Sequence, residues 1–467
     1  MEKKLDKSAP KQELIAQKLS NDPRVLQAKK LLEEAVREHQ QHIKGVLPSD
    51  PEREVAYKQL LEEFGEKRGI NLWYPYLGSG IGNGALVELT DGSVKYDFIG
   101  GIGVHYWGHS HLEIIDTCID AAITDTTMQG NLQQNLESYS LTKLLTSVSG
   151  MDHCFLTSSG VMANENALKI LFQYKHPADR ILAFEHCFAG RTLAFASITD
   201  KPQYRAGLPP CLNVDYIPYY NPRAPKESTE RALGVLKDHL KRYPNQHAAM
   251  IFELVQGEGG FYPGDTDFFV ALMKELKKHD VKIFVDEVQT FGRLPKLFAF
   301  QYFQLEKYVD IVTIGKLSQV CATLYRKALK PKPGLLSQTF TGSSAQIQSG
   351  HLIIKNLIEE NYFGPNGKIQ KIHEYFVQGL ENIEHKYPSL ISGPWGLGAM
   401  IAFTPYDGDS KKVMNLSHRL FDAGVICFVT GSEPTRIRFL LPMGAITEQD
   451  IDNVLKIIEK TLVNQSE

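Results

Sequence analysis

The sequence lacks features that mark several classes of protein. No apolar run in its 467 residues approaches the roughly 20 residues of a membrane-spanning helix. The N-terminal stretch MEKKLDKSAP is charged and has no apolar core of the kind found in secretory signals. The formal net charge is only -3, which gives no general attraction to nucleic acid or to an anionic membrane surface. We therefore expect no nucleic-acid partner and no membrane association.

Cysteine is also scarce and scattered. The six cysteines form no CxxC pair and no Cys/His cluster with the spacing of a zinc site. They stand singly along the chain, at Cys118, Cys154, Cys187, Cys211, Cys321 and Cys427. Isolated cysteines are typical of free thiols in a reducing compartment, so the sequence predicts a cytoplasmic protein without a metal site.

The middle of the chain alternates between short apolar runs and amphipathic helical stretches. Strands are predicted at 153–157, 180–184, 248–255, 281–286 and 310–315. Short, continuously apolar strands that are separated by helices indicate an α/β fold. Because such strands are buried on both sides, we expect a mostly parallel sheet with helices on both faces.

Changes of pattern along the chain predict four regions. Residues 1–66 are rich in Lys, Glu and Gln and are expected to form an N-terminal helical extension. Residues 67–110, with a hairpin around the turn 91–92, are expected to begin a smaller domain. Residues 111–344 would form the large domain, and residues 345–467 would complete the smaller α+β domain.

Chemically active groups follow three of the predicted strands. Ser159 and Gly160 follow the first strand named above, Asp286 ends the fourth, and Lys316 follows the fifth. In open α/β sheets, ligands lie beyond the carboxyl ends of the strands. A hydroxyl, a carboxylate and an amine are therefore expected to point into one crevice.

Each group alone also suits an ordinary structural role. Ser159 suits a simple helix N-cap, Asp286 a loop cap, and most lysines at strand ends reach solvent. Together they suit a phosphate at a helix N-terminus and a carboxylate beside a pyridinium nitrogen. A partly buried lysine has a lowered pKa, so Lys316 would be a nucleophile toward an aldehyde and later a base.

These motifs resemble the class III, or ω-type, aminotransferases, which are pyridoxal-phosphate (PLP) enzymes of fold type I. The family includes acetylornithine, ornithine and lysine ε-aminotransferases, and the resemblance covers the chain from about residue 70 onward. DEVQT at 286–290 is similar to the family signature, and a lysine follows thirty positions later. The resemblance implies PLP as cofactor, Lys316 as its Schiff-base lysine and Asp286 as the partner of its ring nitrogen.

The same resemblance implies roles around the cofactor ring. Phe188 in EHCFAGRT matches the aromatic residue that stacks on the ring, and Val288 would pack under it. Gln289 would meet the ring hydroxyl. Glu253, in a stretch that resembles a Glu-Pro-x-Gln-Gly-Glu run, would lie near the cofactor.

Phosphate binding is implied for two segments. Ser159, Gly160 and Val161 match the phosphate-binding turn of the family. Thr339 matches a threonine that reaches the phosphate from the neighbouring subunit, so the resemblance implies a homodimer with shared active sites.

Three residues are implied in substrate binding. Arg191 falls where acetylornithine enzymes hold a substrate carboxylate, and Arg438 falls where the family binds an α-carboxylate. Glu258 would pair with Arg438 as a gate, although the two residues also suit a structural ion pair. The expected reaction is ping-pong transfer of an amino group from acetylornithine or ornithine to 2-oxoglutarate. Lysine and 4-aminobutyrate are the alternative donors.

Departures from the family pattern leave the substrate open. Ala189 stands where many relatives have His, Leu254 replaces the usual Pro, and the segment after DEVQ is one residue shorter. A PLP aminomutase or decarboxylase would share the fold and the lysine. A non-catalytic PLP-fold binding protein is a third alternative. DEVQT with Arg438 favours transamination, since a dicarboxylate acceptor has to be held, and the intact Asp–Gln–Lys set argues against a non-catalytic protein.

Overall fold

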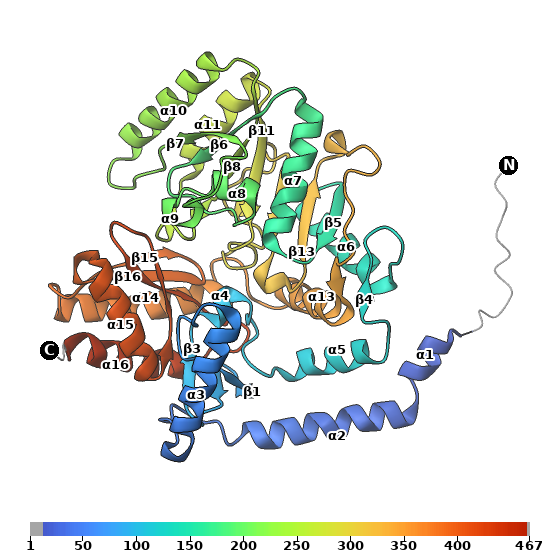
Figure 1. Ribbon diagram of the computed structural model, residues 1–467, viewed down its shortest axis with the longest axis vertical. Coiled ribbons are helices and arrows are strands. Elements are labelled where there is room, and N and C mark those ends of the chain that lie inside the picture. Colours follow the sequence, from blue (N-terminus) through green and yellow to red (C-terminus); the bar gives the residue numbers. More distant parts are fainter. Residues whose placement is uncertain (1–12, 465–467) are drawn as a thin grey trace.

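A seven-stranded sheet forms the centre of the computed structural model, which describes residues 13–464. Its strands are β5 (His153–Thr157), β6 (Arg180–Phe184), β7 (Asn213–Ile217), β8 (His247–Phe252), β11 (Lys282–Glu287), β12 (Ile311–Ile314) and β13 (Cys321–Tyr325). The strand order is β5-β13-β12-β11-β8-β6-β7 (Figure 1). Only β13 runs antiparallel to its neighbours; all other pairs in this sheet are parallel. The predicted α/β fold with a mostly parallel sheet is confirmed.

Helices cover both faces of this sheet, as expected. The main ones are α6 (Leu136–Ser149), α7 (Gly160–Lys175), α10 (Pro225–Arg242) and α11 (Thr266–Lys278). Along β6, Ile181 and Ala183 join the apolar cluster that contains residues of α7, whereas Leu182 and Phe184 join the cluster on the other face. Successive side chains of a strand point to opposite faces, so a continuous apolar run requires this two-sided cover.

Two smaller sheets lie beside the large one. One has the order β15-β16-β19-β18 and the other the order β1-β2-β3-β17. Their strands are β15 (Ile391–Leu397), β16 (Met400–Pro405), β18 (Phe428–Thr430), β19 (Arg436–Leu440), β1 (Gly78–Asn83), β2 (Leu86–Leu89), β3 (Val94–Asp97) and β17 (Val425–Ile426). The strands β2 and β3 form the predicted hairpin, and β17 pairs in parallel with β3. The four domain limits given above stay a prediction.

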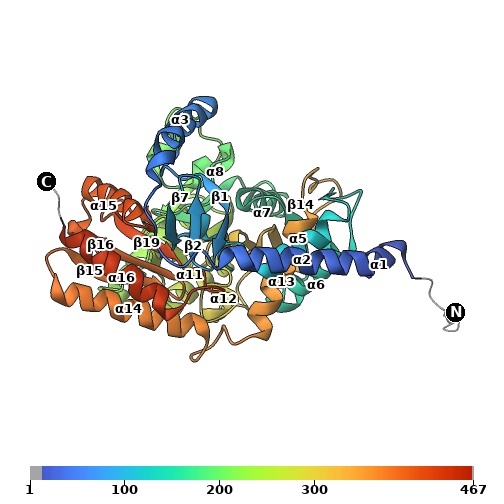
Figure 2. The same cartoon turned by 90° about the horizontal axis from the view of Figure 1, so that it is seen from below.

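Further helices surround these sheets. They are α1 (Ile15–Ser20), α2 (Pro23–Gln40), α3 (Pro51–Arg68), α5 (Leu112–Ala122), α13 (Ser344–Glu359), α14 (Lys368–Lys386), α15 (Ser410–Asp422) and α16 (Glu448–Val463). The helix α2 runs along α5 (Figures 1 and 2), where Lys29 Nζ lies 2.9 Å from Asp116 and 2.7 Å from Asp120. Residues 1–12 of the predicted extension lie outside the described residues. No helix within 13–464 is both long enough and apolar enough to cross a membrane.

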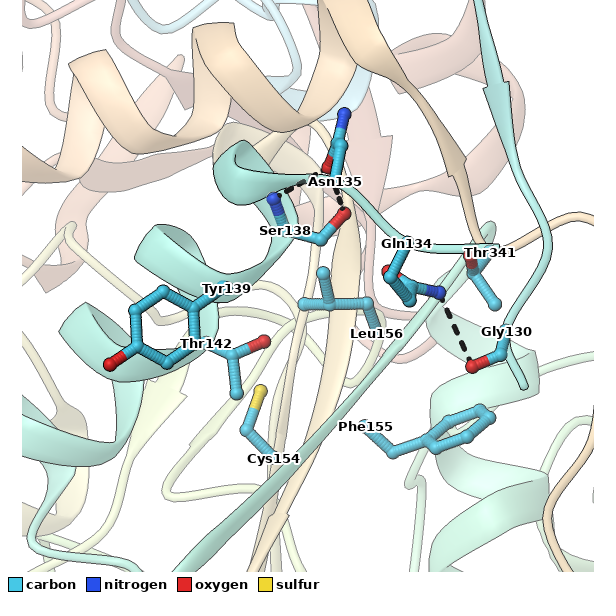
Figure 3. A pocket seen from close by; sticks show the side chains of 10 residues that line it. All are labelled: Gly130, Gln134, Asn135, Ser138, Tyr139, Thr142, Cys154, Phe155, Leu156 and Thr341. Carbon is cyan, nitrogen blue, oxygen red and sulfur yellow. Dashed lines mark hydrogen bonds between the residues drawn. The ribbon is translucent and has the colours of Figure 1, made fainter. Parts of the chain in front are cut away.

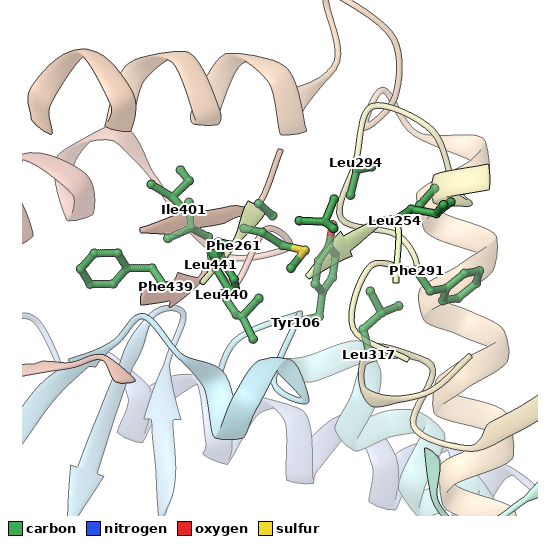
Figure 4. Close-up of a cluster of buried hydrophobic side chains, with 14 of the residues drawn as sticks. Tyr106, Leu254, Phe261, Phe291, Leu294, Leu317, Ile401, Phe439, Leu440 and Leu441 are labelled. Atoms are coloured by element: carbon green, nitrogen blue, oxygen red, sulfur yellow. The ribbon is translucent and has the colours of Figure 1, made fainter. Parts of the chain in front are cut away.

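A buried apolar cluster joins the loops of the large sheet to β19 (Figure 4). Phe261, Phe291 and Leu317 come from loops of the large sheet, and Phe439 and Leu440 come from β19. Burying one large apolar side chain contributes about 1.5–3 kcal/mol. This packing therefore holds β19 firmly against the loops that follow β11 and β12.

Candidate active site

A cavity of about 540 Å³ lies beyond the carboxyl ends of β11 and β12. Nine of the residues singled out from the sequence line it: Gly160, Val161, Phe188, Arg191, Glu253, Asp286, Val288, Gln289 and Lys316. Ser158 lines the cavity in place of its neighbour Ser159. The amine, the carboxylate and the glycine turn thus meet in one place, although they come from three separate strand ends.

Lys316 begins a short 3-10 turn directly after β12. Its backbone lies in the left-handed region, with φ of 57°. Such strain in a residue other than glycine costs about 1–3 kcal/mol and is concentrated at functional sites. Burial lowers the pKa of Lys316 to about 8, and Asp286 opposes this shift. The unprotonated amine, which a nucleophile or base requires, is therefore far more populated near neutral pH than in an exposed lysine.

Asp286 is buried near the end of β11 and is held by two donors. Its Oδ1 accepts a hydrogen bond from the Val288 N–H at 2.9 Å, and its Oδ2 accepts one from Asn164 Nδ2 at 2.7 Å. Asn164 is fixed in turn, because its Oδ1 accepts from the Thr313 hydroxyl at 2.6 Å. Burial raises the pKa of Asp286, while the hydrogen bonds and Lys316 act in the opposite direction. A cationic partner in the cavity would keep this carboxyl group ionised.

Asn164 and Thr313 were missed in the sequence. A signal for Asn164 was available, because it lies beside Ala163 on the buried side of α7, where an apolar residue is expected. Nothing in the sequence distinguishes Thr313 from other threonines in strands.

The N-terminus of α7 opens onto the cavity. Ser159 is its N-cap, and the Ser159 Oγ accepts a hydrogen bond from the Met162 N–H at 3.3 Å. Gly160 follows, and a Cβ atom at this position would lie 2.6 Å from Val288 Cγ1. Glycine therefore allows close packing against Val288, while the free N–H groups and the positive end of the helix dipole favour an anion here.

Glu253 lines the same cavity and contacts Phe188. Its Oε2 accepts from the Phe188 N–H at 2.8 Å, and its Oε1 accepts from the Gly257 N–H at 3.2 Å. Burial raises the pKa of Glu253 to about 8. At neutral pH this group is therefore mostly protonated. Arg191, by contrast, is exposed, and its guanidinium stacks on the Tyr204 ring at 4.0 Å.

Glu258 and Arg438 form a buried ion pair beside the cavity. Arg438 Nη2 lies 2.5 Å from Glu258 Oε1, and Arg438 is 0% exposed. Gln289 Oε1 also accepts from Arg438 Nη1 at 3.5 Å. The two charges act on the pKa of Lys316 in opposite directions, Glu258 raising it and Arg438 lowering it. Neither residue lines the cavity itself, but Gln289, which does, contacts Arg438.

Comparison with known proteins identifies the family of this chain. Residues 80–462 match the family described as "Aminotransferase class-III".

The chain belongs to the class-III aminotransferases.

Relatives of this aminotransferase include an acetylornithine aminotransferase of Methanocaldococcus jannaschii. The two are 29% identical over 399 residues, which is 81% of this chain and 92% of that protein. An acetylornithine aminotransferase of Archaeoglobus fulgidus is 28% identical over 385 residues, 81% of this chain and 93% of that protein.

Solved structures show the same fold. The lysine aminotransferase from M. tuberculosis gives a TM-score of 0.76 at 21% identity, covering 86% of this chain and 99% of that one. An ornithine aminotransferase from Toxoplasma gondii gives a TM-score of 0.75 at 21% identity, covering 87% of this chain and 97% of that one.

Class-III aminotransferases use PLP, and the cavity of this aminotransferase fits that cofactor. The donors around Asp286 leave the carboxylate facing the cavity, where a pyridinium nitrogen needs an acceptor. At the N-terminus of α7, glycine at position 160 lets the helix pack closely against Val288, and the free N–H groups there suit a phosphate. Lys316 supplies an amine with a lowered pKa. These are the three contacts that a phosphorylated pyridine aldehyde requires.

Thr339 of the aminotransferase does not line the described cavity. It is exposed, as is its neighbour Phe340, in the segment before β14 (Gly342–Ser343). Gln338 ties this segment to the end of β5, because its Oε1 accepts from the Thr157 hydroxyl at 2.5 Å. The prediction that Thr339 acts in a neighbouring subunit stays a prediction.

A second cavity, of about 250 Å³, lies between α6, β5 and the segment around Thr341 (Figure 3). Its polar groups bond mainly to each other: Asn135 Oδ1 accepts from the Ser138 N–H at 2.9 Å and from its hydroxyl at 2.6 Å. Burial raises the pKa of Cys154 to about 12, so its thiol stays protonated. The cysteine of this cavity therefore offers the aminotransferase no thiolate.

Proposed function

We propose that this aminotransferase moves an amino group from an ω-amino donor of the acetylornithine or ornithine type to 2-oxoglutarate in a ping-pong reaction. The observation that carries the proposal is the buried Glu258–Arg438 pair beside a cavity that holds both Lys316 and Asp286. The similarity to acetylornithine aminotransferases supports this donor class. Lysine and 4-aminobutyrate are the alternative donors.

Lys316 and Asp286 would hold PLP at its aldehyde and at its ring nitrogen. Phe188 and Val288 would enclose the ring, and Gln289 would meet its hydroxyl. When bound, PLP supplies a sink for the electrons left behind as the donor carbon loses its proton. Asp286, kept in place by Asn164, would stabilise the positive ring nitrogen on which that sink depends.

The phosphate would lie at the N-terminus of α7. There the backbone N–H groups of Gly160 and Val161 and the capping residue Ser159 form the cradle. Glu253, mostly protonated at neutral pH, would lie near the cofactor without adding a negative charge.

The Lys316 amine would carry the proton between the donor carbon and the cofactor. A base works best when its pKa is near the operating pH, and burial brings the pKa of Lys316 to about 8. The amine comes from the turn after β12, in which the next residues, Leu317 and Ser318, are buried.

The Glu258–Arg438 pair would act as the gate between the two substrates. With an ω-amino donor the pair stays closed, and Glu258 neutralises the arginine while the terminal amine enters. With a dicarboxylate acceptor, Glu258 turns away and the planar fork of Arg438 binds a carboxylate. Arg191 would hold the second carboxylate, leaving its stacking contact on Tyr204.

We further propose a homodimer with shared active sites, in which Thr339 reaches the phosphate of its neighbour. Exposed apolar side chains near this segment support it: Leu132 is 90% exposed and Phe340 is 66% exposed. Large exposed apolar side chains of this kind mark interaction surfaces.

All six cysteines are free, which supports a cytoplasmic location.

Spectra of the purified enzyme test the proposal. The wild type should take up PLP and absorb at the edge of the visible range, and Lys316→Ala should abolish this band. A donor such as acetylornithine, ornithine, lysine or 4-aminobutyrate should change the band, and 2-oxoglutarate should restore it. Turnover of the amine without any acceptor would instead indicate a decarboxylase or aminomutase. A protein that takes up no PLP would be a binding protein.

A further inference from the structure

We propose that Arg436 is a positioning residue that holds the backbone of the turn carrying Glu258. When the gate opens, only the Glu258 side chain then moves. The inference rests on the gate function proposed above for Glu258 and Arg438. Arg436 lies two residues before Arg438 on β19, so both side chains leave the same face of the strand.

Arg436 is a buried cation without an acidic partner among residues 13–464. It is 2% exposed, and no carboxylate forms an ion pair with it in this part of the chain. Its guanidinium lies between two aromatic rings, 4.2 Å from the ring centre of Tyr262 and 4.3 Å from that of Trp395. Removing a charge from water is costly unless hydrogen bonds replace the lost hydration, so such a position needs a specific reason.

The side-chain hydrogen bonds of Arg436 all go to the segment that carries Glu258. Nη1 donates to the Gly260 carbonyl at 2.5 Å, and Nη2 donates to the Tyr262 hydroxyl at 2.8 Å. This segment is the tight turn between β9 (Val255–Gln256) and β10 (Tyr262–Pro263). Arg438 thus holds the Glu258 side chain while Arg436 holds the backbone of the same turn.

Two further contacts from the segment before β19 hold the turn. The Thr430 hydroxyl donates to the Gly257 carbonyl at 2.6 Å, and the Gly431 N–H donates to the Glu258 carbonyl at 3.2 Å. The carbonyls of residues 257, 258 and 260 are therefore all bound from one side. Arg436 supplies the contact at the far end of the turn, so the turn is held at both ends.

This arrangement has a consequence for substrate exchange. A turn whose backbone is held at both ends lets Glu258 swing without moving Gly257, whose N–H donates to the cavity residue Glu253. Arginine suits the role because its rigid fork serves two acceptors on different residues and stacks on aromatic rings, which lysine cannot reproduce.

The test compares the two half-reactions in Arg436→Lys and Arg436→Met. Both variants should bind PLP normally and keep the donor kcat within about twofold. The KM for 2-oxoglutarate should rise about 10-fold or more, the loss expected for one or two hydrogen bonds to a charged group. Tyr262→Phe, which removes only the hydroxyl acceptor, should give a smaller rise in the same KM.

Arg180→Lys is the matched control. Arg180 also stacks on a tyrosine, at 3.7 Å from the Tyr243 ring centre, but it pairs with Asp215. It is the first residue of β6 and so lies at the end of the strand away from the cavity. This variant should leave the KM for 2-oxoglutarate unchanged. A wild-type KM in Arg436→Lys, or an equal loss in both half-reactions, would overturn the proposal. Glu258→Gln tests the gate separately: an unchanged acceptor KM there would refute the gate itself.

Discussion

Replacing Asn164 with alanine should weaken PLP binding although Asn164 has no predicted contact with the cofactor. The change removes the donor that lies 2.7 Å from Asp286 Oδ2. A hydrogen bond to a charged group is worth about 1.5–3 kcal/mol. Loss of that amount destabilises the ionised carboxylate and raises the pKa of Asp286 by roughly one to two units. A more readily protonated Asp286 is a poorer partner for a pyridinium nitrogen.

The same free energy predicts the size of the effect on affinity. At about 1.4 kcal/mol for each factor of ten, PLP should bind about 10-fold to 150-fold more weakly. The assay removes the cofactor by dialysis, adds PLP back in steps and follows the visible band. Melting temperatures of the PLP-free proteins should be measured in parallel, because the variant also leaves the Thr313 hydroxyl and the Ala189 carbonyl without their partner.

Asn166→Ala is the matched control. Asn166 lies two residues along the same helix and is equally buried, but its side-chain amide has no hydrogen-bond partner in the described part of the chain. Its removal should leave PLP binding unchanged. If Asn164→Ala bound PLP within twofold of the wild type, the idea that Asn164 keeps Asp286 ionised would be wrong.

Three more predictions concern the same cavity and its buried charges. Gly160→Ala should weaken PLP binding, because the added Cβ would meet the Val288 side chain. In the control Gly234→Ala, the added Cβ has no atom within 4 Å, so this variant should be about 0.5–1 kcal/mol more stable in urea titrations. The pKa of Glu253 is raised from 4.5 to about 8 in the folded protein. As the pH rises from about 4.5 to 8, the wild type should therefore lose stability relative to Glu253→Gln, which thermal melts would measure. The pKa of Lys316 is lowered from 10.5 to about 8, so PLP-free Lys316→Met should melt above the wild type at pH 7, and the difference should disappear between pH 8 and 10.5.

The strands show which parts of the fold were predictable. Predictions for β5 and β6 match the structure residue for residue, because a short, continuous apolar run between two helices is typical of a strand buried on both faces. Two strands of the same sheet were missed. The edge strand β7 alternates with polar residues, and β13 follows the Lys316 turn directly. The strand β7 carries no continuous apolar run, and the antiparallel direction of β13 leaves no trace in local periodicity.

The site was predictable only in part. That Lys316 and Asp286 meet follows from the general rule for strand ends. That Asn164 bonds to Asp286 does not, because the two residues are 122 positions apart and depend on how α7 crosses the sheet. Arg436 was likewise overlooked, since its partners lie in a turn 174 to 176 positions away.

The sequence alone determined the order of the strands and helices. It also determined where the lysine, the aspartate and the glycine turn lie relative to them, because hydrophobic periodicity and chain order are local properties. The tertiary structure decided how these groups behave. It sets the pKa of Lys316 near 8 by burial and joins Glu258 to Arg438 across 180 residues. Burial and contacts between distant segments arise only when the chain is folded, and no local pattern records them.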